Sequence, residues 1–232
     1  LTVRNVEIYD SGSRGVFGSS ANGLELEGCT ISGSPGTGIY LLSSGSGGFN
    51  DTVVKGCDRS LYSFGSNLLN ITNCSFEGGM NCSEIRNGVN DMLGYNSISC
   101  QSPLWFNMEN SVDVKIIGNT FTRCSPFLRG ASTNFDNTIV VENTVNGRPL
   151  SYYNDTDGLS FSGQQGPFIL ESCTNFTFDG VQIDQAGPGI CAVNCNWLTV
   201  KESSFGSDYC GLYLYYTDNA NVTNNTFDGG YY

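Results

Sequence analysis

An eight-residue pattern recurs along the whole chain and constrains its fold more than any other feature. Its copies read "LTVRNVEI" at 1, "LELEGCTI" at 24, "TVVKGCDR" at 52, "LNITNCSF" at 69, "DMLGYNSI" at 91, "VKIIGNTF" at 114, "TIVVENTV" at 138, "FTFDGVQI" at 176, "LTVKESSF" at 198 and "ANVTNNTF" at 220. The third residue is apolar in every copy: Val3, Leu26, Val54, Ile71, Leu93, Ile116, Val140, Phe178, Val200 and Val222. A strand this short cannot bury its apolar side chains alone, so the copies must stack on one another.

Further short strands precede several copies, as in "GVF" at 15, "LYSF" at 61, "PFIL" at 167, "GICAV" at 189 and "GLYLYY" at 211. Gly, Asn and Ser turns separate them, and no long segment has the apolar spacing of an amphipathic helix. Strands of successive coils would lie parallel, about 4.8 Å apart. The sequence therefore predicts an all-β fold, a parallel β-helix of about ten coils. We expect one domain over 1–232 with a longer, insertion-bearing coil at about 146–167. A β-sandwich, the alternative, does not explain a fixed third position.

The sixth position of the copies forms a second column. It holds Val6, Cys29, Cys57, Cys74, Asn96, Asn119, Asn143, Val181, Ser203 and Asn225. Stacked Asn side chains can hydrogen-bond from coil to coil. We expect these residues to be structural rather than catalytic.

Ten cysteines and no histidine accompany this pattern, and no paired C-x-x-C spacing indicates a zinc site. This cysteine content favours an oxidising, extracellular or cell-surface location. N-x-S/T sequons point the same way and predict glycosylation at Asn50, Asn70, Asn73, Asn81, Asn154, Asn175, Asn221 and Asn224.

The repeat register predicts which cysteines lie close enough to form disulfides. Cys173 and Cys195 each lie three residues before a copy, so we expect them to pair on adjacent coils. Cys100 and Cys124 follow the ends of their copies, which predicts a second bridge. Cys191 with Cys210 is a weaker third pair. The remaining cysteines are expected to be packed thiols (Cys29, Cys57, Cys74) or to lack an intrachain mate (Cys82).

The formal charge of −12 argues against nucleic acid as a partner, because phosphate backbones need basic surfaces. No segment is apolar enough to span a membrane. No catalytic or metal-ligating residue is assigned. The weak calcium candidates are Asp155 and Asp157 in "YYNDTDG", which we interpret first as a solvated turn.

Two kinds of segment resemble a known family. "GNTF", "NNTF", "GIYL" and "GLYL", repeated near 22 residues, resemble the right-handed parallel β-helix repeats of carbohydrate-binding and sugar-hydrolysis domains, including the NosD-like group. "ENTVNGRPLSYY" (142–153) resembles the "N-T-V-N-G-K-P" segment of NosD-like proteins on archaeal cell surfaces, particularly in methanogens. The resemblance implies a right-handed coil. Enzymes of this kind act on acidic polysaccharides with clustered carboxylates, often with calcium, and a Lys or Arg.

Two hypotheses of function follow. The first is a structural cell-envelope protein, not an enzyme: a subunit of a sheath, surface layer or fibre that assembles with itself through its sheet ends and through intermolecular disulfides. We favour it because the repeat starts at Leu1 and no capping element follows the last copy. The alternative is a polysaccharide-active enzyme, lyase or hydrolase, or a carbohydrate-binding module, with glycans as partners. The aromatics Tyr213, Tyr215 and Tyr216 would stack on sugars or pack against a neighbouring subunit.

Overall fold

The computed structural model describes residues 1–79, 83–129, 137–184, 187–206 and 210–228, without the side chains of 101–107 and 129. The described residues form strands and turns only, and among them no helix is long and apolar enough to cross a membrane. Nearly all strand pairs are parallel, and each joins one coil to the next. The predicted parallel β-helix is therefore confirmed.

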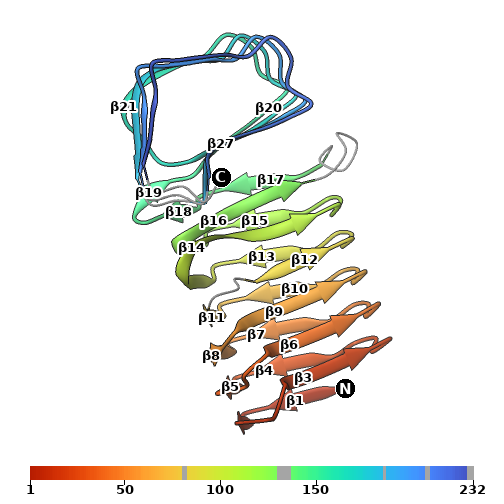
Figure 1. The fold of residues 1–232 in the computed structure, drawn as a ribbon. Coiled ribbons are helices and arrows are strands. Elements are labelled where there is room, and N and C mark those ends of the chain that lie inside the picture. The colour runs from red at the N-terminus through yellow and green to blue at the C-terminus, as the bar shows by residue number, and fades with distance from the viewer. Residues whose placement is uncertain (80–82, 130–136, 185–186, 207–209, 229–232) are drawn as a thin grey trace.

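Residues 1–150 form a first stack of coils with three faces (Figure 1). The first face is a seven-stranded sheet: β1 (Thr2–Arg4), β4 (Glu25–Glu27), β7 (Gly48–Asn50), β10 (Asn70–Thr72), β13 (Met92–Gly94), β15 (Lys115–Ile117) and β17 (Ile139–Val141). The second face holds β2 (Glu7–Tyr9), β5 (Thr30–Ser32), β8 (Val53–Cys57) and β11 (Ser75–Gly78). The third face holds β3 (Arg14–Ser19), β6 (Thr37–Leu42), β9 (Arg59–Phe64) and β12 (Glu84–Arg86).

Two long strands, β14 (Ser97–Glu109) and β16 (Thr120–Arg129), run across both the second and the third face and join them into one sheet. The short β18 (Thr144–Val145) and β19 (Arg148–Pro149) form an antiparallel pair that ends this stack. The predicted insertion-bearing coil at about 146–167 begins here, where the chain leaves the first stack.

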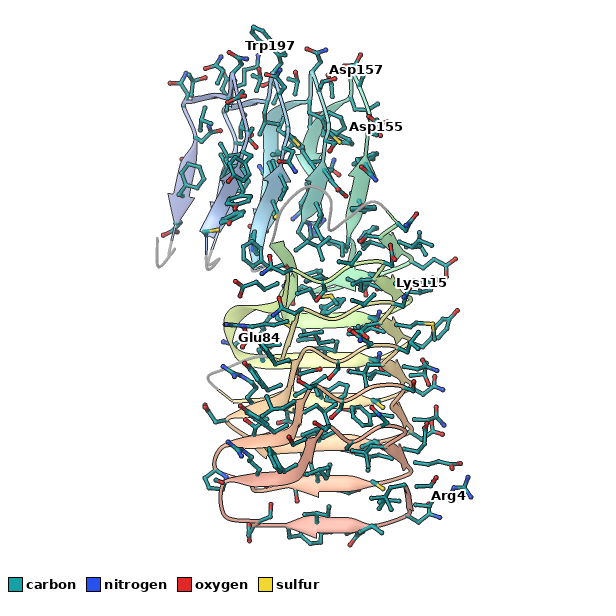
Figure 2. All side chains as sticks on the ribbon, turned by 90° about the vertical axis from the view of Figure 1, so that its right-hand side faces the viewer. Arg4, Glu84, Lys115, Asp155, Asp157 and Trp197 are labelled. Carbon is teal, nitrogen blue, oxygen red and sulfur yellow. The ribbon has the colours of Figure 1, made fainter. Side chains whose placement is uncertain are left out.

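Residues 151–228 form a second stack whose coils run in a different direction (Figures 1 and 2). One sheet holds β20 (Ser151–Asn154), β22 (Phe168–Glu171), β24 (Pro188–Val193) and β27 (Cys210–Tyr215). The other holds β21 (Ser160–Gln164), β23 (Thr177–Asp184), β25 (Thr199–Lys201), β26 (Ser204–Gly206), β28 (Asn221–Thr223) and β29 (Thr226–Asp228). Because β17 and β23 lie in separate sheets, the column expected to run from Val3 to Val222 is broken after Val140. That the chain is a single domain stays a prediction.

The third-position column is interior in the first stack, with one correction. Leu26, Ile71, Leu93 and Ile116 are buried and aligned on successive strands, and the strand between Leu26 and Ile71 presents Phe49. Val54 lies instead in the next column, between Ile31 and Phe76. The third copy therefore starts at 47, which replaces spacings of 28 and 17 residues by 23 and 22.

The predicted Asn ladder is present inside the first stack. The side-chain oxygen of Asn119 accepts the backbone N–H of Asn96 at 2.9 Å, and Asn143 does the same for Asn119 at 2.9 Å. Their amides donate to carbonyls of earlier strands, from Asn96 to Ile71 at 3.0 Å and from Asn119 to Leu93 at 2.9 Å. This satisfies polar groups that have no access to water, so the column is structural.

The two stacks meet on the third face of the first. Phe127 of β16 packs edge-on against Tyr213 of β27, with ring centroids 4.6 Å apart, and the Cys191 thiol points to the Leu128 carbonyl at 3.8 Å. Phe127 is 1% exposed although its side chain points out of the first stack. The junction therefore covers the end of this face and leaves β3, β6, β9 and β12 open.

Candidate functional site

The open part of the third face carries a row of side chains that we name the ladder face: Arg14, Phe17, Tyr40, Arg59, Tyr62, Glu84, Arg86 and Glu109. Inward positions of the same strands hold buried Ile39, Leu41, Leu61 and Ile85. Because side chains alternate between the two sides of a strand, Phe17, Tyr40, Tyr62, Glu84, Arg86 and Glu109 point outward. Arg14 and Arg59 lie on the same surface because they contact the rings of Tyr40 and Tyr62. The strand register aligns Phe17 with Tyr40, Tyr40 with Tyr62, and Tyr62 with Glu84.

Aromatic rings form the first part of the ladder face. Tyr40 and Tyr62 stack with centroids 4.8 Å apart and planes 23° apart, and Phe17 continues the row 5.9 Å from Tyr40. Arg14 lies over Tyr40 at 4.1 Å, and Arg59 lies over Tyr62 at 5.2 Å. Phe17 keeps 54% of its surface exposed. Tyr40 and Tyr62 are half-buried. A partly exposed row of rings backed by cations offers both an apolar surface and hydrogen-bond donors.

Two glutamates and two arginines form the second part. Glu84, only 7% exposed, lies between Arg59 at 3.4 Å and Arg86 at 2.5 Å. Arg86 also reaches Glu109 on the neighbouring strand at 3.4 Å. The same Nε atom makes both Arg86 contacts, which brings an oxygen of Glu84 within about 6 Å of an oxygen of Glu109.

The positive charge of Arg86 is stabilised by the negative charges of Glu84 and Glu109. Partial burial opposes the charge of Arg86, but the hydrogen bond and charge of Glu84 and the nearby Glu109 outweigh it and raise the Arg86 pKa. Among the described residues, the Nε of Arg59 is buried with no hydrogen-bond partner. Leaving a buried donor unsatisfied costs about 1 to 3 kcal/mol, which favours a role for Arg59 beyond folding.

Sequence reasoning missed this cluster. Its signal was present, because Phe17, Tyr40, Tyr62 and Glu84 follow one another at 23, 22 and 22 residues. The residue type changes along that column from aromatic to acidic, and only the strand pairing shows that these positions are neighbours.

The predicted calcium candidates, Asp155 and Asp157, are both exposed. Asp157 accepts hydrogen bonds from Thr174 and Asn175, both at 2.7 Å, and these bonds lower its pKa. Tyr152 donates to the buried Glu171 at 2.8 Å instead of facing Asp155, and burial together with Glu171 raises the Tyr152 pKa. No group of three or more potential metal ligands occurs in the described part of the chain. Calcium at Asp155 and Asp157 stays a prediction.

Lys201 lies 3.0 Å from Asp179 on the adjacent strand. Of the three tyrosines expected to stack on sugars or pack against a neighbouring subunit, Tyr213 packs against Phe127 in the junction and Tyr215 is half-buried, while Tyr216 is 69% exposed.

The cysteines follow the register only in part. Cys100 is disulfide-bonded but Cys124 is free, so the predicted bridge between them is wrong. A register shift in β14 sets Leu104, not Cys100, opposite Cys124. The bridge from Cys191 to Cys210 is also absent, because Cys191 is free and lies opposite Tyr213, while Cys210 lies opposite Pro188.

Cys173 and Cys195 are thiols in contact on adjacent coils, as their flanking bridge between Thr174 and Asn196 requires. A hydrogen bond between the two side chains lowers the pKa of Cys173 to about 7. Their oxidation to a disulfide stays a prediction.

Seven of the eight predicted glycosylation sites lie in the described residues, and Asn81 lies outside them. Asn50 is half-buried, whereas Asn70, Asn73, Asn154, Asn175, Asn221 and Asn224 are exposed. Their occupancy stays a prediction.

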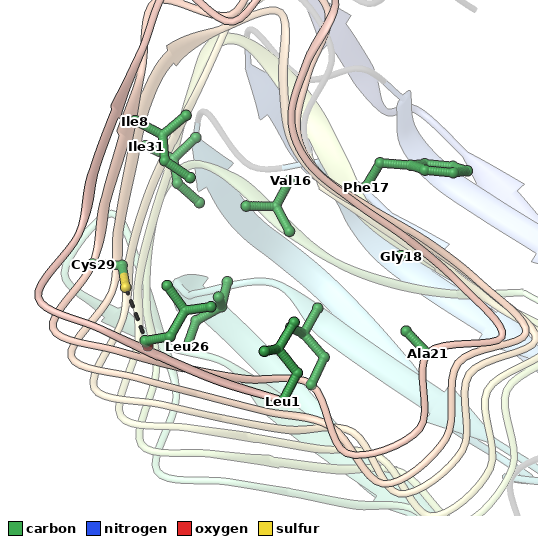
Figure 3. Close-up of a pocket in the computed structure, with 11 residues that line it drawn as sticks. Leu1, Ile8, Val16, Phe17, Gly18, Ala21, Leu26, Cys29 and Ile31 are labelled. Atoms are coloured by element: carbon green, nitrogen blue, oxygen red, sulfur yellow. Dashed lines mark hydrogen bonds between the residues drawn. The ribbon is translucent and has the colours of Figure 1, made fainter.

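A hollow of about 160 Å³ opens at the first coil (Figure 3). It is lined by apolar side chains such as Leu1, Val16 and Leu26, and Phe17 points away from it toward the ladder face. The hollow is the coil interior seen from its end. A ligand site usually adds a few polar groups that orient the ligand, and this lining supplies little beyond apolar contact.

Comparison with known proteins gives the same fold. Residues 1–100 match a family model described as "Right handed beta helix region". Two similar solved structures are those of DFA-IIIase from Arthrobacter chlorophenolicus A6, in complex with GF2 and with DFA-III. They have 16% and 15% sequence identity and TM-scores of 0.46 and 0.45, and each covers 87% of this chain. The chain spans 45% and 44% of their lengths. No curated protein sequence matches the chain.

These findings change the expectations of function. The similar structures are those of an enzyme, so the expectation that the chain is not an enzyme is corrected. Nothing among them supports a sheath or surface layer, and the finer resemblance to NosD-like archaeal proteins is not confirmed. At this level of identity the likeness extends to the fold alone. What the match and the strand pairing establish is that the chain is a right-handed parallel β-helix.

Proposed function

We propose that the chain is a carbohydrate-active protein that binds a polysaccharide along the ladder face and hydrolyses it at Glu84 and Glu109. The observation that carries this proposal is the pair of carboxylates held by one guanidinium, Arg86, at the end of a partly exposed aromatic row. A sugar ring has an apolar face that packs on aromatic rings and hydroxyls that bond to carboxylates and guanidinium groups. The ladder face offers aromatic rings, carboxylates and guanidinium groups.

Glycoside hydrolysis needs one carboxyl group as acid and a second as nucleophile or base. Enzymes that retain the sugar's configuration keep these groups about 5 to 5.5 Å apart, and enzymes that invert it keep them farther apart. Both carboxylates contact the same nitrogen of Arg86, so the nearest oxygens of Glu84 and Glu109 are at most about 6 Å apart. This separation favours the retaining geometry.

A carbohydrate-binding module is the second candidate. It is favoured by the contacts of Arg86 with both carboxylates, because a guanidinium between them can orient both groups toward sugar hydroxyls without any reaction. The two candidates share a ligand and a surface but differ in whether the ligand is cleaved.

The test is release of reducing ends from a panel of plant, algal and microbial polysaccharides, measured beside binding by calorimetry. Glu84→Gln and Glu109→Gln should each lower the rate about 100-fold or more and leave binding nearly unchanged. Tyr62→Ala should weaken binding. The control is Glu27→Gln, which alters an exposed ion pair with Arg4 on another face of the first stack (Figure 2). Binding without cleavage of any polysaccharide would establish the module, and binding that Tyr62→Ala leaves intact would reject the ladder face.

A further inference from the structure

We propose that a groove on the second stack binds a neutral saccharide, with Trp197 as its stacking surface. The groove has a volume of about 380 Å³ and is lined by Asn175, Thr177, Trp197, Thr199, Asn219 and Asn221. It lies far from the ladder face: Trp197 stands at the edge of the second stack that is turned away from the first, and Glu84 lies in the middle of the first (Figure 2). The proposal does not depend on the proposed function.

Two parallel rows of side chains form the groove. The first follows the turn before each strand and holds Asn175, Trp197 and Asn219, whose neighbours Thr174, Asn196 and Asp218 are bridged from coil to coil. The second lies on the strands themselves, where Thr177, Thr199 and Asn221 are in direct register on β23, β25 and β28. Each row repeats at the strand spacing of about 4.8 Å. The groove therefore runs along the stack and suits an extended ligand.

The fold gives no reason for a tryptophan at position 197. Its φ is +55°, in the left-handed region, where the same turn position holds Asn175 at +54° and Asn219 at +53°. Asn tolerates this conformation, whereas for other side chains it costs about 1 kcal/mol or more. Trp197 is also 58% exposed, so little burial offsets that cost. Leu68, Tyr95 and Tyr216 are also exposed at a positive φ, so this conformation does not by itself mark a site. Trp197 differs in that its exposed ring lines the groove beside polar side chains.

The strand row supplies the polar contacts. Among the described residues, no hydrogen bond is made by the side chains of Thr177, Thr199 or Asn221. Hydroxyl and amide groups both donate and accept, as sugar hydroxyls do. Such groups beside an exposed aromatic ring are the combination that a saccharide requires.

The charges around the groove favour a neutral ligand. None of the six lining residues is charged. Asp157, at the edge, is engaged by Thr174 and Asn175, and Lys201 is paired with Asp179 at 3.0 Å. An acidic sugar would meet no free cation here, which separates this groove from the arginine-rich ladder face.

Asn175 and Asn221 also begin two of the predicted glycosylation sequons. A glycan attached at either residue would occupy the same groove. The protein for the test is therefore the full chain produced in a host without N-glycosylation.

The experiment is calorimetric titration with neutral hexasaccharides of β-linked glucose, mannose and xylose, and with an oligogalacturonate as the charged counterpart. Trp197→Asn is the informative variant, because Asn matches the neighbouring turns and should preserve the fold. We expect binding of at least one neutral hexasaccharide, and a loss of tenfold or more in affinity in Trp197→Asn. Tyr216→Ala removes another exposed aromatic residue of this stack and should leave affinity unchanged.

Three results would overturn the proposal: no binding of any neutral hexasaccharide, equal affinity in Trp197→Asn, or preference for the oligogalacturonate. A loss of affinity in Tyr62→Ala but not in Trp197→Asn would place the saccharide on the ladder face. Thermal unfolding of Trp197→Asn checks its integrity, and its midpoint should equal or exceed that of the unaltered chain.

Discussion

Asp91 carries a buried carboxyl group in the wall of the first stack. Its replacement by Asn tests how the ionisation of this group changes the free energy of unfolding. The residue is 0% exposed. Its Oδ1 accepts the backbone N–H of Leu69 at 2.9 Å, while within the described residues its Oδ2 has no partner. Burial raises the pKa of Asp91 from 3.8 to about 7, although the bond from Leu69 opposes the rise.

The sign of the pH dependence follows from this shift. Between the two pKa values the folded chain holds a proton that the unfolded chain has released, so raising the pH favours unfolding. The stabilisation is full below the unfolded pKa of 3.8 and is lost as the pH rises through the folded pKa of about 7. Between pH 5 and pH 8 the expected loss is about 2.5 kcal/mol.

Asp91→Asn keeps the acceptor for Leu69 and removes the titration. Asn96 and Asn119 show that amides are accommodated in this interior when they donate to a carbonyl. We expect urea unfolding of the variant, followed by circular dichroism, to vary less between pH 5 and pH 8 than that of the unaltered chain. Asp113→Asn, at an exposed turn of the next coil, is the control. Equal pH dependence in the chain and in Asp91→Asn would refute the reasoning.

Three further predictions concern the interior and the junction. Asn119→Ala should cost about 2 to 4 kcal/mol in urea unfolding, because it leaves the buried backbone N–H of Asn96 and C=O of Leu93 without partners; a cost below 1 kcal/mol would contradict the ladder's role. Under oxidising conditions, peptide mapping without reduction should recover a bridge between Cys173 and Cys195, and free thiols at both would reject it. Tyr213→Ala should lower the free energy of unfolding by about 1 kcal/mol or more through lost contact with Phe127, and an unchanged value would argue against a packed junction.

The sequence predicts the parts of this fold that repeat with the same chemistry. The first-face strands and the Asn ladder were predictable because each coil must place an apolar residue inward at the same step and satisfy the same buried groups. Val54 was assigned to the wrong column because "TVVKGC" has an apolar third residue and a cysteine at the sixth, as the copies at 24 and 69 do, whereas the true copy around Phe49 begins with two glycines. The register shift in β14 separates Cys100 from Cys124, and it does not alter the eight-residue pattern of the sequence.

Only one feature of the sequence indicated the change of direction after Val140. It is the interval of 38 residues between the starts of two successive copies. A length alone does not say whether the extra residues form a loop on a continuing coil or begin a new stack. The contact of Phe127 with Tyr213 decides it, and these rings are 86 residues apart in the sequence, so no local pattern joins them.

The repeat pattern could not predict the candidate sites, and the reason is physical. Inward columns are held to similar residues by packing, because a side chain there must fit the ones above and below it. Outward columns carry no such constraint, so one column can change from Phe17 to Tyr62 to Glu84 without harm to the fold. Parallel, in-register strands then bring these different side chains within contact distance of one another. A solenoid of this kind assembles a binding surface from residues far apart in the sequence, and a break in the expected residue type on an outward column is where such a surface should be sought.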